Sequence, residues 1–143
     1  MARRFPLAGL LRLRHAEQDR AAAVLATANE RVRDAADARL AARRSLADAE
    51  GAQPITDAAT MSAVAAARAA TRGMLEELDA VTRSRRADAD RAQADYNDAR
   101  RSALGLEKLE AQHDRQQTAE ELRTEQNALD EIAARSRTEG GAR

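Results

Sequence analysis

The sequence contains no cysteine and no tryptophan, and Phe5 and Tyr96 are its only aromatic residues apart from histidine. The absence of cysteine excludes a disulfide framework but is neutral about the redox compartment. Each large apolar side chain stabilises a fold by roughly 1.5–3 kcal/mol when it is buried. Such side chains are sparse, because most of the 43% hydrophobic content is alanine. The sequence therefore disfavours a compact globular core and favours a narrow seam between helices.

The charged residues balance, with 24 basic and 24 acidic side chains and a net charge of zero. Long-range attraction to nucleic acid or to anionic lipid requires a positive excess. We therefore expect no nucleic-acid partner. The first twenty residues are an exception, because they hold five arginines and only two acidic residues.

Long apolar runs are also missing. The longest one, Ala21–Ala26, is far shorter than the roughly 20 residues that span a bilayer. Arg12 and Arg14 interrupt the apolar residues near the start, so we expect no secretory signal. Together these features predict a cytoplasmic protein.

A repeat of apolar residues, in alternating steps of four and three, runs along the first third of the chain. Such a repeat keeps one helix face toward a partner helix. Pro6 suits a first helical turn, whereas Gly51 suits a left-handed helix end and Pro54 prevents continuation. We predict a first helix over residues 6–50 and a turn over residues 51–56. Ten of the thirteen repeat positions are apolar, and the thirteen are Leu7, Leu11, Arg14, Gln18, Ala21, Leu25, Ala28, Val32, Ala35, Arg39, Ala42, Leu46 and Ala49.

The repeat resumes after the turn. Thr56 and Asp57 suit a helix start, and Gly73 and Gly105 are weak points at which the helix is able to bend or break. We predict a second helix over residues 57–136 and a frayed tail over 137–143. Ten of the fourteen repeat positions are apolar, and the fourteen are Met61, Val64, Arg68, Thr71, Leu75, Leu78, Thr82, Arg85, Ala89, Ala92, Tyr96, Ala99, Ala103 and Leu106.

Folding the chain back at the turn brings the two stripes together. The fold class expected is all-α, an antiparallel two-helix coiled-coil hairpin that forms a single domain over residues 1–143. The register expected from a tight turn pairs Leu46 with Met61, Val32 with Leu75, and Leu11 with Tyr96.

The second helix is expected to be the longer one and to project past the first, which should end near the level of Ala99. Beyond Leu106 the same register becomes polar, and a sparser apolar set takes over, formed by Leu109, Leu122, Leu129 and Ile132. Roughly thirty C-terminal residues would then lack an internal partner, and an isolated helix of that length is only marginally stable. We infer that its apolar side meets another protein.

Sequence motifs for catalysis are absent. There is no glycine-rich phosphate loop, no nucleophile elbow and no cysteine–histidine cluster. His15 and Asp19 lie one helical turn apart but are too few to hold a metal. The acidic stretch between Glu107 and Glu125 is typical of a solvated helix face. We therefore expect no catalytic residue, metal, cofactor or small-molecule substrate, because a two-helix rod should offer no cleft.

The arginine-flanked leucines at the start leave three interpretations open. They form a helix start that the C-terminal helix covers, a plug that enters a ring or groove on a partner, or a helix that lies on a membrane surface.

Both ends of the chain resemble one family. Phe5-Pro6-Leu7 followed by Leu10-Leu11-Arg12-Leu13-Arg14 resembles the opening of flagellar FliJ proteins. The segments 106–110 (Leu-Glu-Lys-Leu-Glu) and 125–133 (Glu-Gln-Asn-Ala-Leu-Asp-Glu-Ile-Ala) resemble the family's closing segment. Length and helix layout agree as well, so the likeness covers nearly the whole chain.

The resemblance implies a non-catalytic stalk of the flagellar type III export apparatus. Its implied partners are the hexameric export ATPase, which it binds and stimulates, the export-gate membrane protein and export chaperones, at the cytoplasmic face of the inner membrane. Carried onto this chain, the surface for the ATPase ring comprises Phe5, Leu7, Leu10, Leu11, Arg14, Leu129, Asp130, Glu131 and Ile132. The surface for the export gate is assigned to Met74, Leu75 and Leu78, which are also seam residues. The alternatives are the equivalent stalk of an injectisome and a coiled-coil scaffold at a membrane surface.

Overall fold

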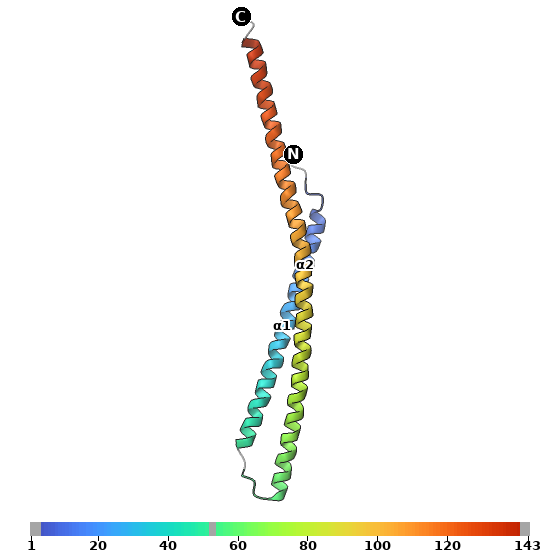
Figure 1. Cartoon of the computed structure of the whole chain (residues 1–143), viewed down its shortest axis with the longest axis vertical. Helices are drawn as coiled ribbons and strands as arrows, with labels where there is room; N and C mark the ends of the chain where they lie inside the picture. Colours follow the sequence, from blue (N-terminus) through green and yellow to red (C-terminus); the bar gives the residue numbers. More distant parts are fainter. Residues whose placement is uncertain (1–3, 52–53, 141–143) are drawn as a thin grey trace. The chain divides into compact units, whose positions relative to one another are not determined.

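The computed structural model describes residues 4–51 and 54–140, which form two α-helices and no strand. Helix α1 spans Ala8–Gly51 and helix α2 spans Ala58–Gly140 (Figure 1). The contacts divide the chain into two compact units. Unit 1 comprises residues 1–17 and 99–143, and unit 2 comprises residues 18–98. The predicted all-α class, with a longer second helix, is confirmed.

Helix α1 begins two residues later than predicted and ends one residue later. Its first turn is closed by hydrogen bonds that Ala8 N donates to Phe5 O at 3.2 Å and Leu11 N donates to Leu7 O at 2.9 Å. The expectation of a left-handed Gly51 is wrong, because no glycine among the described residues has a positive φ. Residues 52 and 53 of the predicted turn lie outside the described residues.

Helix α2 runs for 83 residues without a break at Gly73 or Gly105. Each glycine costs roughly 1 kcal/mol relative to alanine, which is too little to interrupt a helix that packs along its length. Asp57 caps the start of α2, because Thr60 N donates to its Oδ1 at 2.6 Å. Residues 137–140, predicted as frayed, are helical, and residues 141–143 lie outside the described residues.

In unit 2, α1 and α2 pack antiparallel along the predicted stripes. Ala28, Ala35 and Ala92 are buried at the seam, and Thr82 is buried with its hydroxyl donating to Leu78 O at 2.8 Å. Every stripe position of α1 from residue 18 to residue 46, and of α2 from 64 to 96, is buried or half-buried. The seven-residue repeat thus identified the face of each helix correctly.

The register between the two helices differs from the predicted one. Arg39 forms an ion pair with Asp79, whereas the tight-turn register places residue 68 opposite it, eleven residues earlier. The predicted pairs Leu46–Met61 and Val32–Leu75 are therefore wrong. In unit 1, His15 bonds Glu107, which excludes the predicted pair of Leu11 with Tyr96.

The connection between the two helices is long enough to allow this shift. Six residues separate Gly51 from Ala58, and six extended residues span up to about 20 Å. In unit 2 the first turns of α2 consequently extend beyond the end of α1 (Figure 1), and Met61 is exposed. A shift of eleven residues is about three helical turns, so it leaves the same face toward the partner helix.

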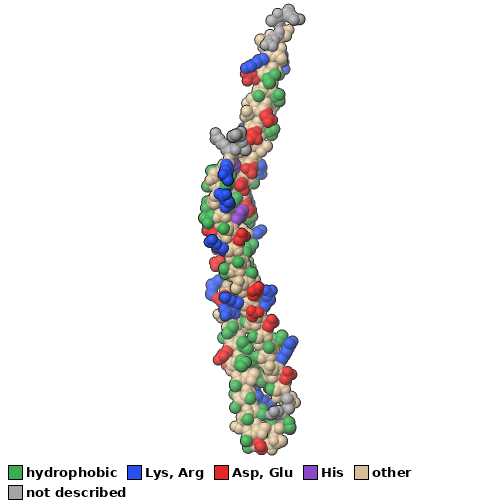
Figure 2. Space-filling view, turned by 180° about the vertical axis from the view of Figure 1, so that it is seen from behind, with side chains coloured by type: hydrophobic (Ala, Val, Ile, Leu, Met, Phe, Trp, Pro, Cys, Tyr) green, Lys and Arg blue, Asp and Glu red, His purple; other side chains and the backbone are tan. Residues whose placement is uncertain are grey.

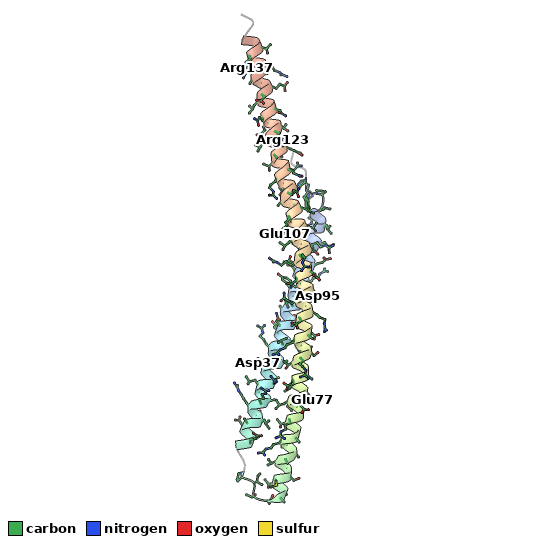
Figure 3. The ribbon with its side chains drawn as sticks, viewed as in Figure 1. Asp37, Glu77, Asp95, Glu107, Arg123 and Arg137 are labelled. Carbon is green, nitrogen blue, oxygen red and sulfur yellow. The ribbon has the colours of Figure 1, made fainter. Side chains whose placement is uncertain are left out.

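In unit 1, the half-buried face of α2 ends at Gln117 among the described residues. Leu11 and Ala103 are buried there, and the half-buried positions of α2 continue through Glu110, His113 and Gln117. Phe5 lies at the level of His113, so the expectation that the first helix ends near Ala99 is wrong. From residue 118 to residue 138 every side chain is exposed, as predicted for a projecting segment (Figure 3).

Candidate functional site

Two contacts hold the start of α1 against α2 in unit 1. The Phe5 and His113 rings lie 5.6 Å apart between centroids and are tilted by 59°. His15 Nε2 lies 2.7 Å from Glu107 Oε1, with both side chains a little under half exposed. Each contact joins residues about a hundred positions apart, so the sequence indicated neither and suggested only Asp19 as a neighbour of His15.

The five candidate ring-binding residues at the start of the chain differ in exposure. Leu11 is only 6% exposed and belongs to the seam. Leu7 and Leu10 are partly exposed, and Phe5 is half-buried against His113. Arg14 Nη1 donates to Glu17 Oε2 at 2.8 Å, one turn along the same helix. Leu7 and Leu10 are therefore the members of this group that a partner can reach with least rearrangement.

The candidate ring-binding residues at the other end all lie on the projecting segment. Leu129 and Ile132 are 66% and 64% exposed. Asp130 is exposed, and Glu131 accepts a hydrogen bond from Arg135 Nη2 at 2.5 Å. Large aliphatic side chains at this exposure cost free energy in water, and covering them releases it. Leu129 and Ile132 are therefore accessible to a partner.

Unit 1 does not bring these two groups together. Phe5 lies at the level of His113, and Leu129 is sixteen residues further along the same helix. At about 1.5 Å per residue the separation is about 24 Å. The two groups therefore occupy different levels of unit 1.

The candidate gate-binding residues lie on α2 in unit 2. Leu75 and Leu78 are half-buried in the seam, and Met74 beside them is exposed. Packing in the seam accounts for the presence of leucine at positions 75 and 78. It does not account for Met74, which is exposed.

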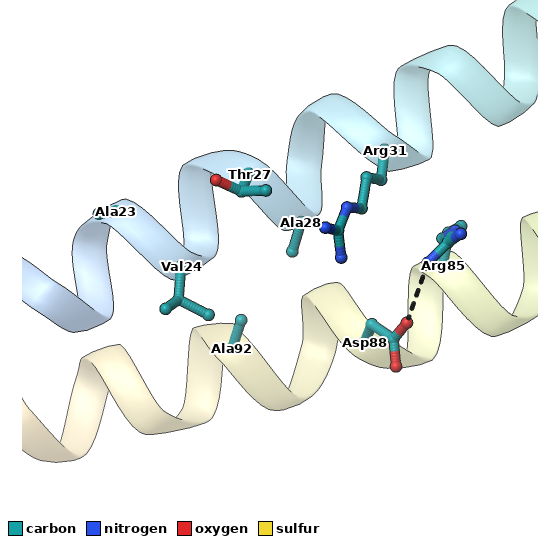
Figure 4. Close-up of a pocket in the computed structure, with 8 residues that line it drawn as sticks. All are labelled: Ala23, Val24, Thr27, Ala28, Arg31, Arg85, Asp88 and Ala92. Carbon is teal, nitrogen blue, oxygen red and sulfur yellow. Dashed lines mark ion pairs between the residues drawn. The ribbon is translucent and has the colours of Figure 1, made fainter.

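Unit 2 also contains a cleft between α1 and α2 that sequence analysis excluded (Figure 4). Its volume is about 400 Å³. The small side chains Ala28 and Ala92 face one another there, and the Arg31 side chain extends from α1 into the gap. On α2, Arg85 lies 3.9 Å from Asp88. The signal in the sequence was the alanine at facing seam positions, where a leucine would have filled the space. The lining residues are Ala23, Val24, Thr27, Ala28, Arg31, Arg85, Asp88 and Ala92.

Comparison with known proteins decides the family. The family model described as Flagellar FliJ protein matches residues 3–140, which is nearly the whole chain. The chain belongs to the FliJ family. No curated protein and no solved structure matches it.

Membership of the FliJ family makes the chain a flagellar export-related protein of a non-catalytic family, in agreement with the resemblance of its two ends. None of the helices in the described ranges 4–51 and 54–140 is long and apolar enough to cross a membrane. Within the same ranges, no three histidine, aspartate or glutamate side chains are grouped closely enough to hold a metal ion.

At the start of α2 in this FliJ family member, hydrogen bonds perturb the pKa of Asp57. The backbone N–H and the side chain of Thr60 hydrogen-bond to the Asp57 carboxylate and lower its pKa below the ordinary value. The effect is that of a helix cap, because the carboxylate satisfies an N–H group that has no partner inside the helix.

Proposed function

We propose that this protein is a stalk of the flagellar type III export apparatus, which binds and stimulates the hexameric export ATPase and links it to the export gate. It would act at the cytoplasmic face of the inner membrane, as a peripheral component. The observation that carries the proposal is the projecting end of α2, where Leu122, Leu129 and Ile132 are all exposed. Family membership supplies the export apparatus as the setting.

The proposed mechanism requires contacts and no chemistry. A ligand shifts a conformational equilibrium only when it binds one state more tightly than another. A single helix has one apolar side, so it contacts the subunits of a surrounding ring unequally. Leu129 and Ile132 would contact one subunit at a time. They would stabilise the conformation in which that subunit covers them.

The separation within unit 1 refines this arrangement. The two candidate ring-binding groups lie about 24 Å apart along α2. The projecting end would enter the ring alone, and Leu7 and Leu10 would contact a different level of the ATPase. The proposal supported here is thus a thin tip followed by a two-helix collar.

The test measures ATP hydrolysis by the purified export ATPase with and without the full chain. We expect stimulation by the unaltered chain and a large loss with Leu129→Ser combined with Ile132→Ser, because each lost apolar contact weakens binding by about tenfold. Met61→Ser is a matched control, since Met61 is comparably exposed but lies in unit 2. The proposal would be refuted if the unaltered chain neither stimulated the ATPase nor bound to it.

The link to the export gate has a separate test. Met74→Ser removes the exposed member of the candidate gate surface, and Val24→Ser removes an exposed side chain at the cleft in unit 2. We expect Met74→Ser to weaken binding to the cytoplasmic part of the gate protein and Val24→Ser to leave it unchanged. If Val24→Ser weakened binding and Met74→Ser did not, the gate protein would bind at the cleft. If neither variant weakened binding, neither surface would bind the gate protein.

A further inference from the structure

The two halves of unit 1 carry opposite charge. The half in which α1 packs on α2, residues 4–17 and 99–113, holds six arginine and lysine residues against three acidic ones, a net charge of +3. The projecting half, residues 114–140, holds four basic residues against seven acidic ones, a net charge of −3. Between residues 116 and 134 there are five carboxylates and a single arginine, Arg123. We name these the positive half and the negative half of unit 1.

Both halves also present large apolar side chains to water. The negative half exposes Leu122, Leu129 and Ile132. The positive half exposes a second group, composed of Leu7, Leu10, Leu13, Leu104 and Leu109. Figure 2 shows hydrophobic and basic side chains gathered together over the start of α1. These leucines lie off the seam, because the half-buried line of α2 runs through Glu110, His113 and Gln117 instead.

The contacts across unit 1 place part of this apolar group at one level. Phe5 meets His113 and His15 meets Glu107, so Leu10 of α1 and Leu109 of α2 stand at about the same height along the helix pair. Arg12 and Lys108 stand close to that height and are both exposed. The positive half thus offers leucines flanked by cations, and the negative half offers aliphatic side chains flanked by carboxylates.

Charge decides how two copies of this chain would meet. Two negative halves laid against each other would bring Glu120, Glu121, Asp130 and Glu131 of one copy toward the same residues of the other. The negative half against the positive half pairs opposite charges and covers apolar side chains on both sides. Symmetric dimers use one self-complementary surface on both subunits. A two-fold antiparallel arrangement satisfies both contacts at once.

We propose that free chains form an antiparallel two-fold dimer in which the negative half of each unit 1 packs on the positive half of the other copy. The occupant of the exposed leucines in the absence of other proteins is therefore a second copy of this chain. The dimer covers Leu129 and Ile132, so it would compete with any partner that binds the projecting end. The inference does not depend on the proposed stalk function.

The first experiment is sedimentation equilibrium of the full chain over a wide range of concentration. We expect a monomer–dimer equilibrium whose dissociation constant rises about tenfold or more between about 50 mM and about 500 mM salt, as screening weakens the charge pairing. Leu129→Ser combined with Ile132→Ser should weaken the dimer by about 100-fold. Met61→Ser, in unit 2, should leave it unchanged. The proposal would be overturned if the chain stayed monomeric at every concentration, or if the double variant dimerised with the same dissociation constant as the unaltered chain.

The second experiment tests which halves meet. One variant reverses the negative half with Glu120→Arg and Glu121→Arg, and the other reverses the positive half with Arg12→Glu and Lys108→Glu. All four side chains are exposed, so we expect unchanged helical content by circular dichroism. Each variant alone should dimerise at least tenfold more weakly than the unaltered chain. Mixed in equal amounts, the two should recover dimer formation, because each reversed half then faces a half of opposite charge.

The outcomes separate this dimer from others. If the chains paired through their negative halves alone, the variant of the positive half would dimerise as well as the unaltered chain, and the proposal would be wrong. Failure of the mixture to recover would also contradict it. Arg33→Glu combined with Arg44→Glu is the matched control, since both arginines are exposed in unit 2 and their reversal should have no effect on dimer formation.

Discussion

Replacement of Leu11 by alanine should weaken the packing of the start of α1 on α2 in unit 1. Leu11 is 6% exposed, and it is the largest buried side chain of the described part of the molecule. Leu13 is 51% exposed, two residues away on the same helix. The same substitution at Leu13 changes helix propensity equally but removes little buried surface, so the pair isolates the contribution of packing.

The magnitude follows from the geometry of a two-helix seam. Leucine-to-alanine changes in closed cores cost about 2–5 kcal/mol, and the cost grows with the cavity that remains. A seam between two helices is open to water on both sides, so the cavity is small and the lower end applies. We expect about 2 kcal/mol for Leu11→Ala, which is about a 30-fold change in an equilibrium constant. Leu13→Ala should change stability by less than about 0.5 kcal/mol.

The assay is native-state hydrogen exchange at the amides of residues 8–17, which reports opening of this segment by itself. Leu11→Ala should accelerate exchange there by about 30-fold and leave unit 2 unchanged, since only unit 1 contains the contact. Equal effects of the two substitutions, or no effect of Leu11→Ala, would refute the assignment of Leu11 to the seam. A matching acceleration throughout unit 2 would instead show that the two units open together.

Three further predictions follow from individual contacts. Gly73→Ala and Gly105→Ala should each stabilise α2 by about 0.5–1 kcal/mol in thermal unfolding, because a Cβ at either position meets no atom within 4 Å. Asp57→Ala should reduce the hydrogen-exchange protection of the Thr60 amide. Because the pKa of Asp57 is lowered in the fold, the stabilisation by Asp57 is complete above the ordinary aspartate pKa and is lost as the pH falls through the lowered pKa. The Asp57→Ala variant should show no such loss of protection at low pH. Glu107→Gln should cost no more than about 1 kcal/mol in a urea titration, because both members of the His15–Glu107 pair are close to half exposed, and a larger loss would show that the pair is a principal anchor.

The sequence was sufficient to identify which residues face the partner helix. The repeat of apolar and small residues placed Ala28, Ala35, Ala92 and Ala103 at the seam, and all four are buried. Periodicity has this power because a side chain's direction around a helix depends only on its position in the chain. The same logic predicted that Leu122, Leu129 and Ile132 would lack an internal partner.

Register was beyond the reach of the repeat. A shift of eleven residues keeps the same faces in contact, so periodicity gives nearly equal support to several pairings. The contacts that fix the register are polar or aromatic and far apart in sequence, namely Arg39 with Asp79, His15 with Glu107, and Phe5 with His113. Of these six residues, Arg39 lies on a predicted stripe and His113 lies on the polar continuation of the second stripe. The other four lie off both, so the apolar pattern contained no information about these pairings.

The register bears on the cleft in unit 2 and on the distance between the two candidate ring-binding groups in unit 1. The sequence predicted no cleft because a two-helix rod should offer none, whereas the actual pairing sets Ala28 near Ala92 and leaves the cleft in unit 2. The grouping of the two ends of the chain as one surface came from the family resemblance and not from the register, because the tight turn would have set Phe5 opposite residue 102, further from Leu129 than its actual level at His113. The register, which the repeat leaves open, therefore determines which side chains meet at the cleft in unit 2 and how far α2 extends past the start of α1 in unit 1.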